Sequence, residues 1–180
     1  SVRRNAASWP DKPAYIDFSL DSDDRVLSWS EFDRAADNLA AQLRHRGVAP
    51  GDGVAVWHKD SAAIHVLLVA IERCGATAVG LGARAGVREV AQILRTARPT
   101  MVVSDVERHQ QAARAAADAD PSLRPVAFGE GSEQLFLDTS YPRSTSGQSP
   151  LVPDDIFLVM YTSGTTGIPK CVVHTQNRWY

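Results

Sequence analysis

Several features that mark particular classes of protein are scarce in this chain of 180 residues. It has only two cysteines, and no Cys-x-x-Cys pair or cluster of histidine and cysteine suggests a metal site. Lys and Arg (19) nearly balance Asp and Glu (21), and no basic run suggests nucleic acid or an anionic membrane surface. The longest apolar stretch, within residues 62–71, is interrupted by His65 and is too short to cross a bilayer. With 44% hydrophobic residues, the composition is that of an ordinary globular protein.

The chain also lacks the marks of export. No apolar segment of the signal-peptide kind follows the first residues, Ser1-Val-Arg-Arg-Asn5. Because the cysteines are few and Cys74 lies in an apolar helical pattern, we expect a reducing, cytoplasmic setting in which Cys74 is buried. The chain begins without Met and ends at Tyr180, where a helix is expected to start. We therefore expect it to be a fragment of a longer protein.

A β-hairpin followed by a helix is predicted for the N-terminal part. Residues 14–18 alternate between apolar and polar, and residues 25–29 form the expected returning strand beyond an acidic turn. Ser30 is expected to cap the helix, with Asp33 three residues later as in a capping box. Gly47 is expected to end that helix.

Strand and helix patterns then alternate with short connections. This order predicts an α/β fold with a mostly parallel sheet that is flanked by helices on both faces. The expected strands cover residues 54–57, 76–81, 101–103, 125–128, 156–161 and 171–173, and the expected helices cover residues 61–73, 86–96 and 106–119, with a last one beginning at Thr175.

The composition divides the chain into four regions. Residues 1–30 form the hairpin region, and residues 31–138 form the α/β core. Residues 139–153 are rich in Ser, Pro and Gly and show no periodicity, which predicts a surface connection. Residues 154–180 contain a strongly apolar strand that runs directly into a loop with glycines and hydroxyl groups.

This loop carries the candidate chemistry. Its two glycines let the backbone approach a ligand closely, and successive N–H groups in such a turn can bind an anion. Hydroxyl groups add donors, Lys170 adds a positive charge, and no acidic residue lies among them. A polyphosphate needs such a set of donors. The candidate phosphate-binding residues are Thr162, Ser163, Gly164, Thr165, Thr166, Gly167 and Lys170.

Other nucleotide-binding loops fit less well. A Walker loop has Gly-Lys-Ser/Thr in direct succession, whereas Ile168 and Pro169 separate Gly167 from Lys170 here. No Gly-x-Gly-x-x-Gly fingerprint of a Rossmann dehydrogenase is present. The plainer interpretation is a Ser/Thr/Gly loop without a ligand. The position after a buried strand favours a ligand, because open α/β sheets bind ligands at the carboxyl ends of their strands.

The string Tyr161-Thr-Ser-Gly-Thr-Thr-Gly-Ile-Pro-Lys170 closely resembles the AMP-binding signature of the adenylate-forming superfamily, which comprises acyl-CoA synthetases, peptide-synthetase adenylation domains and luciferases. The resemblance extends to Leu27-Ser-Trp-Ser-Glu-Phe, to the segment from Arg46 to Val56 and to Ala70-Ile-Glu-Arg-Cys-Gly-Ala76. One departure is Cys171, because the family usually has glycine after the Pro-Lys pair.

The resemblance implies a chemistry. In this family, ATP and a carboxylic acid give an acyl-adenylate and pyrophosphate, and a thiol, often coenzyme A, then displaces AMP; Mg²⁺ usually accompanies the ATP. By resemblance, residues 162–167 would surround the β- and γ-phosphates and Lys170 would help to neutralise them. The remaining machinery, including the metal-binding carboxylate and the mobile C-terminal domain, is expected beyond Tyr180. We therefore expect the isolated 180 residues to lack ligase activity and to bind ATP weakly or not at all.

Several alternatives remain open. The segment from Gly80 to Leu94 resembles fatty-acid or cyclic-acid CoA ligases and favours an acyl-CoA ligase over a fragment of a peptide-synthetase adenylation domain. A non-catalytic truncated binding module is another alternative, and an unrelated nucleotide-binding α/β domain is a third. Arg84 is interpreted as a solvated loop residue and His174 as a residue at a strand edge.

Overall fold

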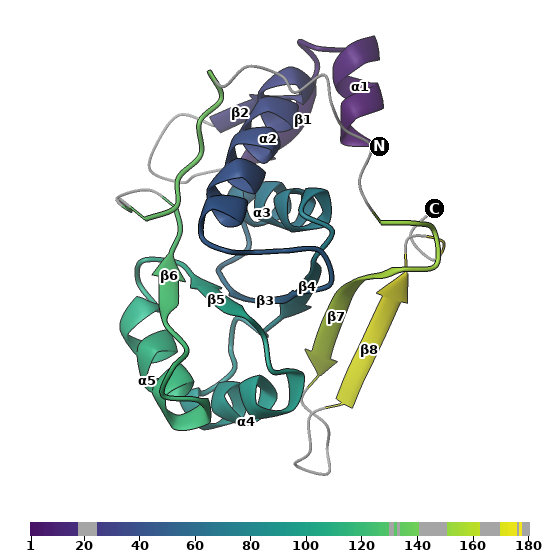
Figure 1. Ribbon diagram of the computed structural model, residues 1–180. Coiled ribbons are helices and arrows are strands. Elements are labelled where there is room, and N and C mark those ends of the chain that lie inside the picture. Colours follow the sequence, from purple (N-terminus) through teal and green to yellow (C-terminus); the bar gives the residue numbers. More distant parts are fainter. Residues whose placement is uncertain are drawn as a thin grey trace.

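The computed structural model describes residues 1–17, 25–129, 132, 134–140, 151–162, 170–175 and 177. A central sheet with helices on both sides makes up most of the molecule (Figure 1). The elements, in chain order, are α1 (Val2–Ser8), β1 (Pro13–Asp17), β2 (Arg25–Ser28), α2 (Trp29–His45), β3 (Gly53–Trp57), α3 (Ala62–Arg73), β4 (Thr77–Gly80), α4 (Val87–Ala97), β5 (Met101–Ser104), α5 (His109–Ala119), β6 (Pro125–Ala127), β7 (Ile156–Thr162) and β8 (Lys170–Thr175).

The sheet has six strands in the order β6-β5-β3-β4-β7-β8. The strands from β6 to β7 all pair in parallel, and β8 pairs antiparallel with β7 at one edge. The predicted α/β fold with a mostly parallel sheet is therefore confirmed. The carboxyl ends of β3, β4, β5, β6 and β7 consequently meet at one edge of the sheet.

Alternate residues of β3 show how the two faces of the sheet are covered. Val54 and Val56 belong to a buried apolar cluster with α2 and α3, whereas Ala55 and Trp57 belong to a second cluster with α4 and α5. Successive side chains of a strand point to opposite faces, so the two helix pairs lie on opposite sides of the sheet. The predicted coverage of both faces is confirmed.

The β1–β2 hairpin is confirmed, but the predicted start of the next helix is wrong. Ser28, not Ser30, is the N-cap of α2: its Oγ accepts from the backbone N–H of Glu31 at 3.3 Å. The Ser28 N–H donates to Glu31 Oε2 at 2.9 Å, which completes a capping box two residues earlier than expected. Ser28 ends strand β2 in an extended conformation, as an N-cap requires, whereas Ser30 already lies in the first helical turn.

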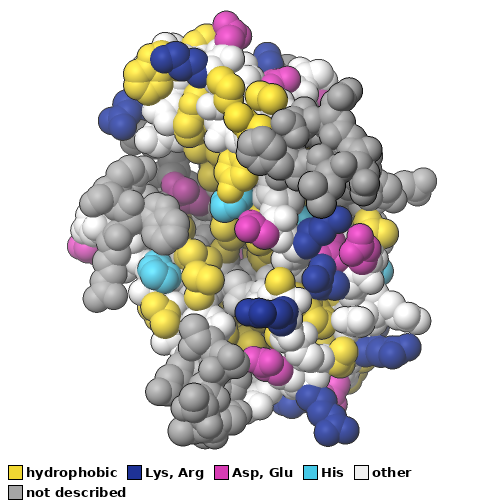
Figure 2. All heavy atoms as spheres, turned by 180° about the vertical axis from the view of Figure 1, so that it is seen from behind, with side chains coloured by type: hydrophobic (Ala, Val, Ile, Leu, Met, Phe, Trp, Pro, Cys, Tyr) yellow, Lys and Arg dark blue, Asp and Glu magenta, His cyan; other side chains and the backbone are white. Residues whose placement is uncertain are grey.

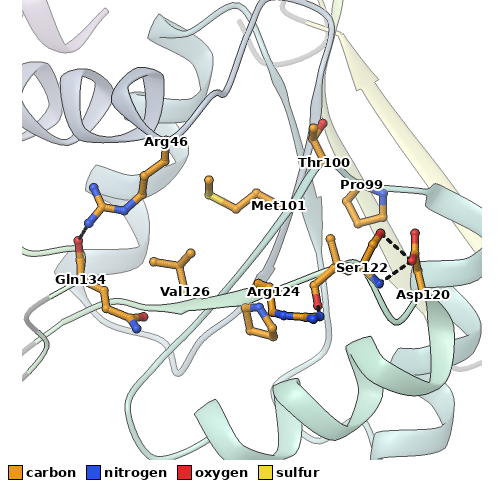
Figure 3. A pocket seen from close by; sticks show the side chains of 11 residues that line it. Arg46, Pro99, Thr100, Met101, Asp120, Ser122, Arg124, Val126 and Gln134 are labelled. Atoms are coloured by element: carbon orange, nitrogen blue, oxygen red, sulfur yellow. Dashed lines mark hydrogen bonds between the residues drawn. The ribbon is translucent and has the colours of Figure 1, made fainter.

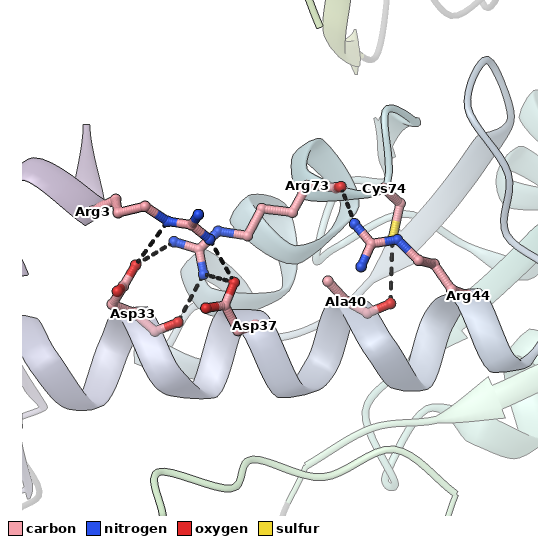
Figure 4. A network of polar contacts seen from close by, with 7 residues as sticks. All are labelled: Arg3, Asp33, Asp37, Ala40, Arg44, Arg73 and Cys74. Carbon is pink, nitrogen blue, oxygen red and sulfur yellow. Dashed lines mark hydrogen bonds and ion pairs between the residues drawn. The ribbon is translucent and has the colours of Figure 1, made fainter. Parts of the chain in front are cut away.

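Asp33, the predicted partner in that box, serves another purpose (Figure 4). Asp33 and Asp37, one turn apart on α2, are both buried and face Arg73 of α3 and Arg3 of α1. The network joins three helices, and its two guanidinium groups balance its two buried carboxylates. Helix α1, which the sequence did not predict, is thus attached to the body of the protein through Arg3.

One predicted helix start is wrong, and two predicted segments lie partly outside the described residues. Helix α5 begins at His109 rather than at residue 106, because residues 106–108 form a turn in which Asp105 accepts from the Arg108 N–H at 2.8 Å. Residues 141–150 of the expected surface connection lie outside the described residues, as do residues 176 and 178–180, where a last helix was expected.

The surface seen from behind carries interspersed charges of both signs (Figure 2). Hydrophobic side chains gather at the end of the molecule formed by α1 and the β1–β2 hairpin, where Trp9, Ile16 and Val26 are exposed (Figure 2). Within the described residues, no helix combines the length and the apolar character that crossing a membrane requires.

Candidate functional site

The β7–β8 hairpin brings together the two ends of the predicted phosphate loop. Thr162, the last residue of β7, lies directly opposite Lys170, the first residue of β8. Because β7 runs parallel to β4, the loop that joins β7 to β8 leaves the carboxyl edge of the parallel sheet. The other predicted site residues, namely Ser163, Gly164, Thr165, Thr166 and Gly167, lie outside the described residues.

The next pair of the ladder, Tyr161 and Cys171, forms the base of this loop. Residues directly opposite each other in an antiparallel ladder share one face, so the two side chains are neighbours. Tyr161 is half-buried and packs against the apolar cluster formed with α4 and α5, whereas Cys171 is exposed. Burial raises the pKa of Tyr161, and the charge and hydrogen bonding of Cys171 raise it further. Cys171, which stands where the family usually has glycine, therefore occupies a strand position with room for its side chain.

The topological switch point of the sheet lies two strands away from this loop. From β3 the chain passes to β4 on one side and later to β5 on the other side, and open α/β sheets commonly bind ligands between such strands. At this switch point, the carboxylate of Asp105 accepts the N–H groups that a ligand could otherwise bind. Asp105 follows β5 and accepts from the Lys59 N–H at 3.0 Å and from the backbone and guanidinium of Arg108.

These contacts also set the protonation state of Asp105. Burial raises the pKa of Asp105, but the hydrogen bonds from Arg108 and Lys59 and the charge of Arg108 outweigh that effect, so its pKa is lowered. The Asp105 carboxylate is therefore ionised and accepts the N–H groups that a ligand phosphate could otherwise accept. The β7–β8 loop is left as the better candidate for binding a nucleotide at this edge.

His58 follows β3 at the same edge and is also buried. Its Nδ1 lies 2.7 Å from the Lys59 carbonyl oxygen, and its ring lies 5.5 Å from that of Phe128. Its Nε2 is buried and has no hydrogen-bond partner among the described residues. Neither His58 nor Asp105 was predicted from the sequence. The available signal was a polar residue directly after each of two buried strands.

Two further residues have the surroundings that the sequence suggested. Arg84 is exposed in the connection after β4, which agrees with a solvated loop residue. His174 lies on the edge strand β8, opposite Leu158 of β7, and is half-buried. Among the described residues, no three His, Cys, Asp or Glu side chains are grouped closely enough to hold a metal ion.

A pocket of about 770 Å³ lies at the opposite edge of the sheet (Figure 3). Its lining includes Met101, Pro125 and Val126, which stand at the amino ends of β5 and β6. The strands themselves separate this pocket from the β7–β8 loop. The pocket is therefore distinct from the candidate phosphate site.

Comparison with known proteins decides the family. The family model described as AMP-binding enzyme matches residues 2–180. The chain belongs to this family. The family resemblance of the loop and of the earlier segments is thereby confirmed.

The relatives of this AMP-binding chain are much longer proteins. The long-chain-fatty-acid–CoA ligase FadD13 of Mycobacterium tuberculosis is 31% identical over 178 residues, which cover 97% of this chain and 34% of that ligase. The nonribosomal peptide synthetase ungA of Aspergillus violaceofuscus is 28% identical over 96% of this chain and 2% of that synthetase. The chain thus spans about a third of the ligase and a small part of the synthetase.

A solved structure agrees with the fold. The crystal structure of the anthranilate CoA ligase AuaEII in complex with anthranoyl-AMP superposes with a TM-score of 0.82 and 26% identity, over 99% of this chain and 34% of that chain.

Proposed function

We propose that this chain is the phosphate-binding part of an ATP-dependent acyl-CoA ligase. The enzyme would activate a carboxylic acid as an acyl-adenylate, with release of pyrophosphate, and then transfer the acyl group to coenzyme A. The observation that carries the proposal is the register of the β7–β8 hairpin, which sets Thr162 opposite Lys170 at the carboxyl edge of the sheet. A cytoplasmic setting and a role in fatty-acid metabolism belong to the same proposal.

The residues of the loop suit a polyphosphate. Neither β7 nor β8 nor the connection between them contains Asp or Glu, so no carboxylate of this hairpin repels an anion. Backbone N–H groups and hydroxyls of residues 162–167 would donate to the β- and γ-phosphates, and the ammonium group of Lys170 would offset their charge. These donors favour the reaction because negative charge grows on the pyrophosphate as it leaves.

Mg²⁺ would accompany the ATP and screen the same phosphates. This hairpin supplies no carboxylate to hold it, so the metal would be held by the phosphates and by groups elsewhere in the protein. The residues of this chain therefore act by binding and orienting the phosphates rather than by transferring protons.

The relatives include both CoA ligases and peptide synthetases, so a second candidate function stands beside the first. The FadD13 ligase is similar over nearly the whole of this chain and is named as a CoA ligase. The ungA synthetase is similar over a comparable share of the chain. A peptide-synthetase adenylation domain, which passes its acyl group to a carrier protein, is therefore the second candidate.

ATP–pyrophosphate exchange tests the proposal. The longest natural polypeptide that contains these residues would be assayed with a panel of fatty and aromatic acids. We expect acid-dependent exchange that Lys170→Ala lowers by about 10²-fold or more. Lys12→Ala is the matched control, because Lys12 lies over the Trp9 ring, away from the hairpin, and its loss should leave exchange unchanged.

Three outcomes would count against parts of the proposal. Unchanged exchange in Lys170→Ala would remove the loop from the phosphate site. Transfer of the acyl group to a carrier-protein thiol but not to coenzyme A would select the second candidate. Adenylate formation by the isolated 180 residues would contradict the expectation that they are inactive alone.

A further inference from the structure

The pocket at the amino edge of β5 and β6 combines an apolar floor with a polar rim (Figure 3). Met101 is buried at its floor, and Val126 is half-buried beside it. Arg46 reaches it from the end of α2, and Arg124 reaches it from the start of β6. The volume of about 770 Å³ lies within the range of small-molecule sites in proteins.

The two arginines of the rim carry charges that the described residues leave without an ion-pair partner. The guanidinium of Arg46 donates to the backbone carbonyls of Gln42 and Gln134, and that of Arg124 donates to the carbonyls of Pro121 and Leu123. Neither forms an ion pair with a carboxylate in the described part of the chain. Carbonyl oxygens satisfy some of the N–H groups, and among the described lining residues the carboxylate of Asp120 acts electrostatically on Arg124.

One carboxylate, that of Asp120, also lines the pocket, and it is already engaged. Its Oδ1 accepts from the Ser122 N–H at 2.8 Å and from the Ser122 hydroxyl at 2.7 Å. Among the described lining residues, two guanidinium groups against one carboxylate leave one net positive charge. An anion is therefore the complementary ligand.

We propose that this pocket binds a small amphipathic carboxylate, with its apolar body on Met101 and Val126 and its carboxylate on Arg46 or Arg124. The planar guanidinium fork matches a carboxylate, and its weak hydration lowers the cost of forming the pair at a partly apolar site. The apolar floor favours such a molecule over inorganic phosphate, because phosphate would gain nothing from covering Met101 and Val126.

This site is separate from the proposed adenylation chemistry. Its residues stand at the amino ends of β5 and β6, whereas Thr162 and Lys170 stand at the carboxyl end of β7. A carboxylate bound here could not reach the phosphates of an ATP held by the β7–β8 loop. The pocket would therefore act as a second, non-catalytic site for an acid, and its existence does not depend on the proposed function.

Titration of the 180-residue chain with octanoate, without ATP, tests the site. We expect one saturable site by calorimetry, with 1-octanol and inorganic phosphate each bound at least fivefold more weakly. Arg46→Gln and Arg124→Gln together should weaken octanoate binding by at least tenfold. Both side chains are exposed, so the variants should keep the wild-type melting temperature. Arg84→Gln is the matched control, because Arg84 is also an exposed arginine and lies at the other edge of the sheet.

Several results would overturn the proposal. These are the absence of saturable octanoate binding, equal binding of octanol, and unchanged affinity in the double arginine variant. A loss of octanoate binding in Lys170→Ala with no loss in the double variant would place the acid at the β7–β8 loop instead. That last outcome would exclude this pocket and would leave the proposed function to be tested by ATP–pyrophosphate exchange.

Discussion

Arg73 binds Asp33 from two directions: its Nη2 donates to the Asp33 carboxylate at 2.6 Å, and its Nη1 donates to the Asp33 carbonyl oxygen at 2.7 Å. The same Nη1 lies 2.7 Å from Asp37 Oδ1, so one guanidinium joins two carboxylates and the backbone of α2 (Figure 4). These side chains are nearly inaccessible to water, so water could not replace a partner removed by substitution. These contacts hold α3 against α2 on one face of the sheet.

Removal of this guanidinium should be costly. We expect Arg73→Ala to lower the free energy of unfolding by about 3–5 kcal/mol, because it leaves two buried carboxylates poorly compensated. Arg95→Ala should cost less than about 1 kcal/mol, since Arg95 pairs with Asp118 in an exposed position. Urea denaturation of both variants measures the difference. Equal costs would mean that the Arg73 network contributes no more than a surface pair.

The position of the helix cap gives a second prediction. Ser28→Ala should lower the free energy of unfolding by about 1 kcal/mol, because the Glu31 N–H would lose its acceptor. Ser30→Ala should have only a small effect, since its hydroxyl caps no backbone group of α2. Thermal unfolding of the two variants distinguishes the serines. A larger loss in Ser30→Ala would return the cap to the position first expected from the sequence.

Asp105 should make stability depend on pH. Its folded-state pKa is below the ordinary value of 3.8, so the carboxylate stabilises the fold above that value and loses its contribution as the pH falls through the lowered pKa. Asp105→Asn should therefore be less stable than the wild type at pH 7, by about 1.5–3 kcal/mol. The gap should close in strong acid. Urea denaturation across pH 2–7 measures the gap, and a constant gap would contradict the assignment.

The two cysteines should differ in reactivity. Burial raises the pKa of Cys74 to about 11, against an opposing effect of Arg44, and the Cys74 thiol donates to the Ala40 carbonyl at 3.5 Å. Cys171 is exposed. We expect one thiol to react with a disulfide reagent at pH 8 in the native protein and two in urea. Cys171→Ser should abolish the fast reaction, and two fast thiols in the native protein would contradict the structure.

The comparison of sequence and structure separates local signals from long-range ones. Strands such as β3 and β7 were predicted well because their apolar runs are short and end in Gly, Pro or polar residues. The cap of α2 was misplaced by two residues because Ser28 and Ser30 both stand before a residue suited to a capping box. Only the extended backbone at Ser28, which β2 imposes, selects between them.

The polar residues show the same limit. Asp33 looked like a local helix-start residue, yet its partners Arg3 and Arg73 lie 30 and 40 positions away in the sequence. Lys59 and Asp105 follow different strands, and the Lys59 N–H reaches Asp105 only because β3 and β5 pair in the sheet. No pattern within one segment contains such information.

The candidate phosphate loop shows the same division between what the sequence and what the structure determined. The sequence by itself determined its donors, its family resemblance and the strand that leads into it, because these depend on residues adjacent in the chain. Only the tertiary structure decided that Thr162 pairs with Lys170, that half-buried Tyr161 packs against the core beside an exposed Cys171, and that Asp105 accepts the N–H groups at the switch point. These relationships depend on strand pairing and burial, which bring together residues far apart in the sequence.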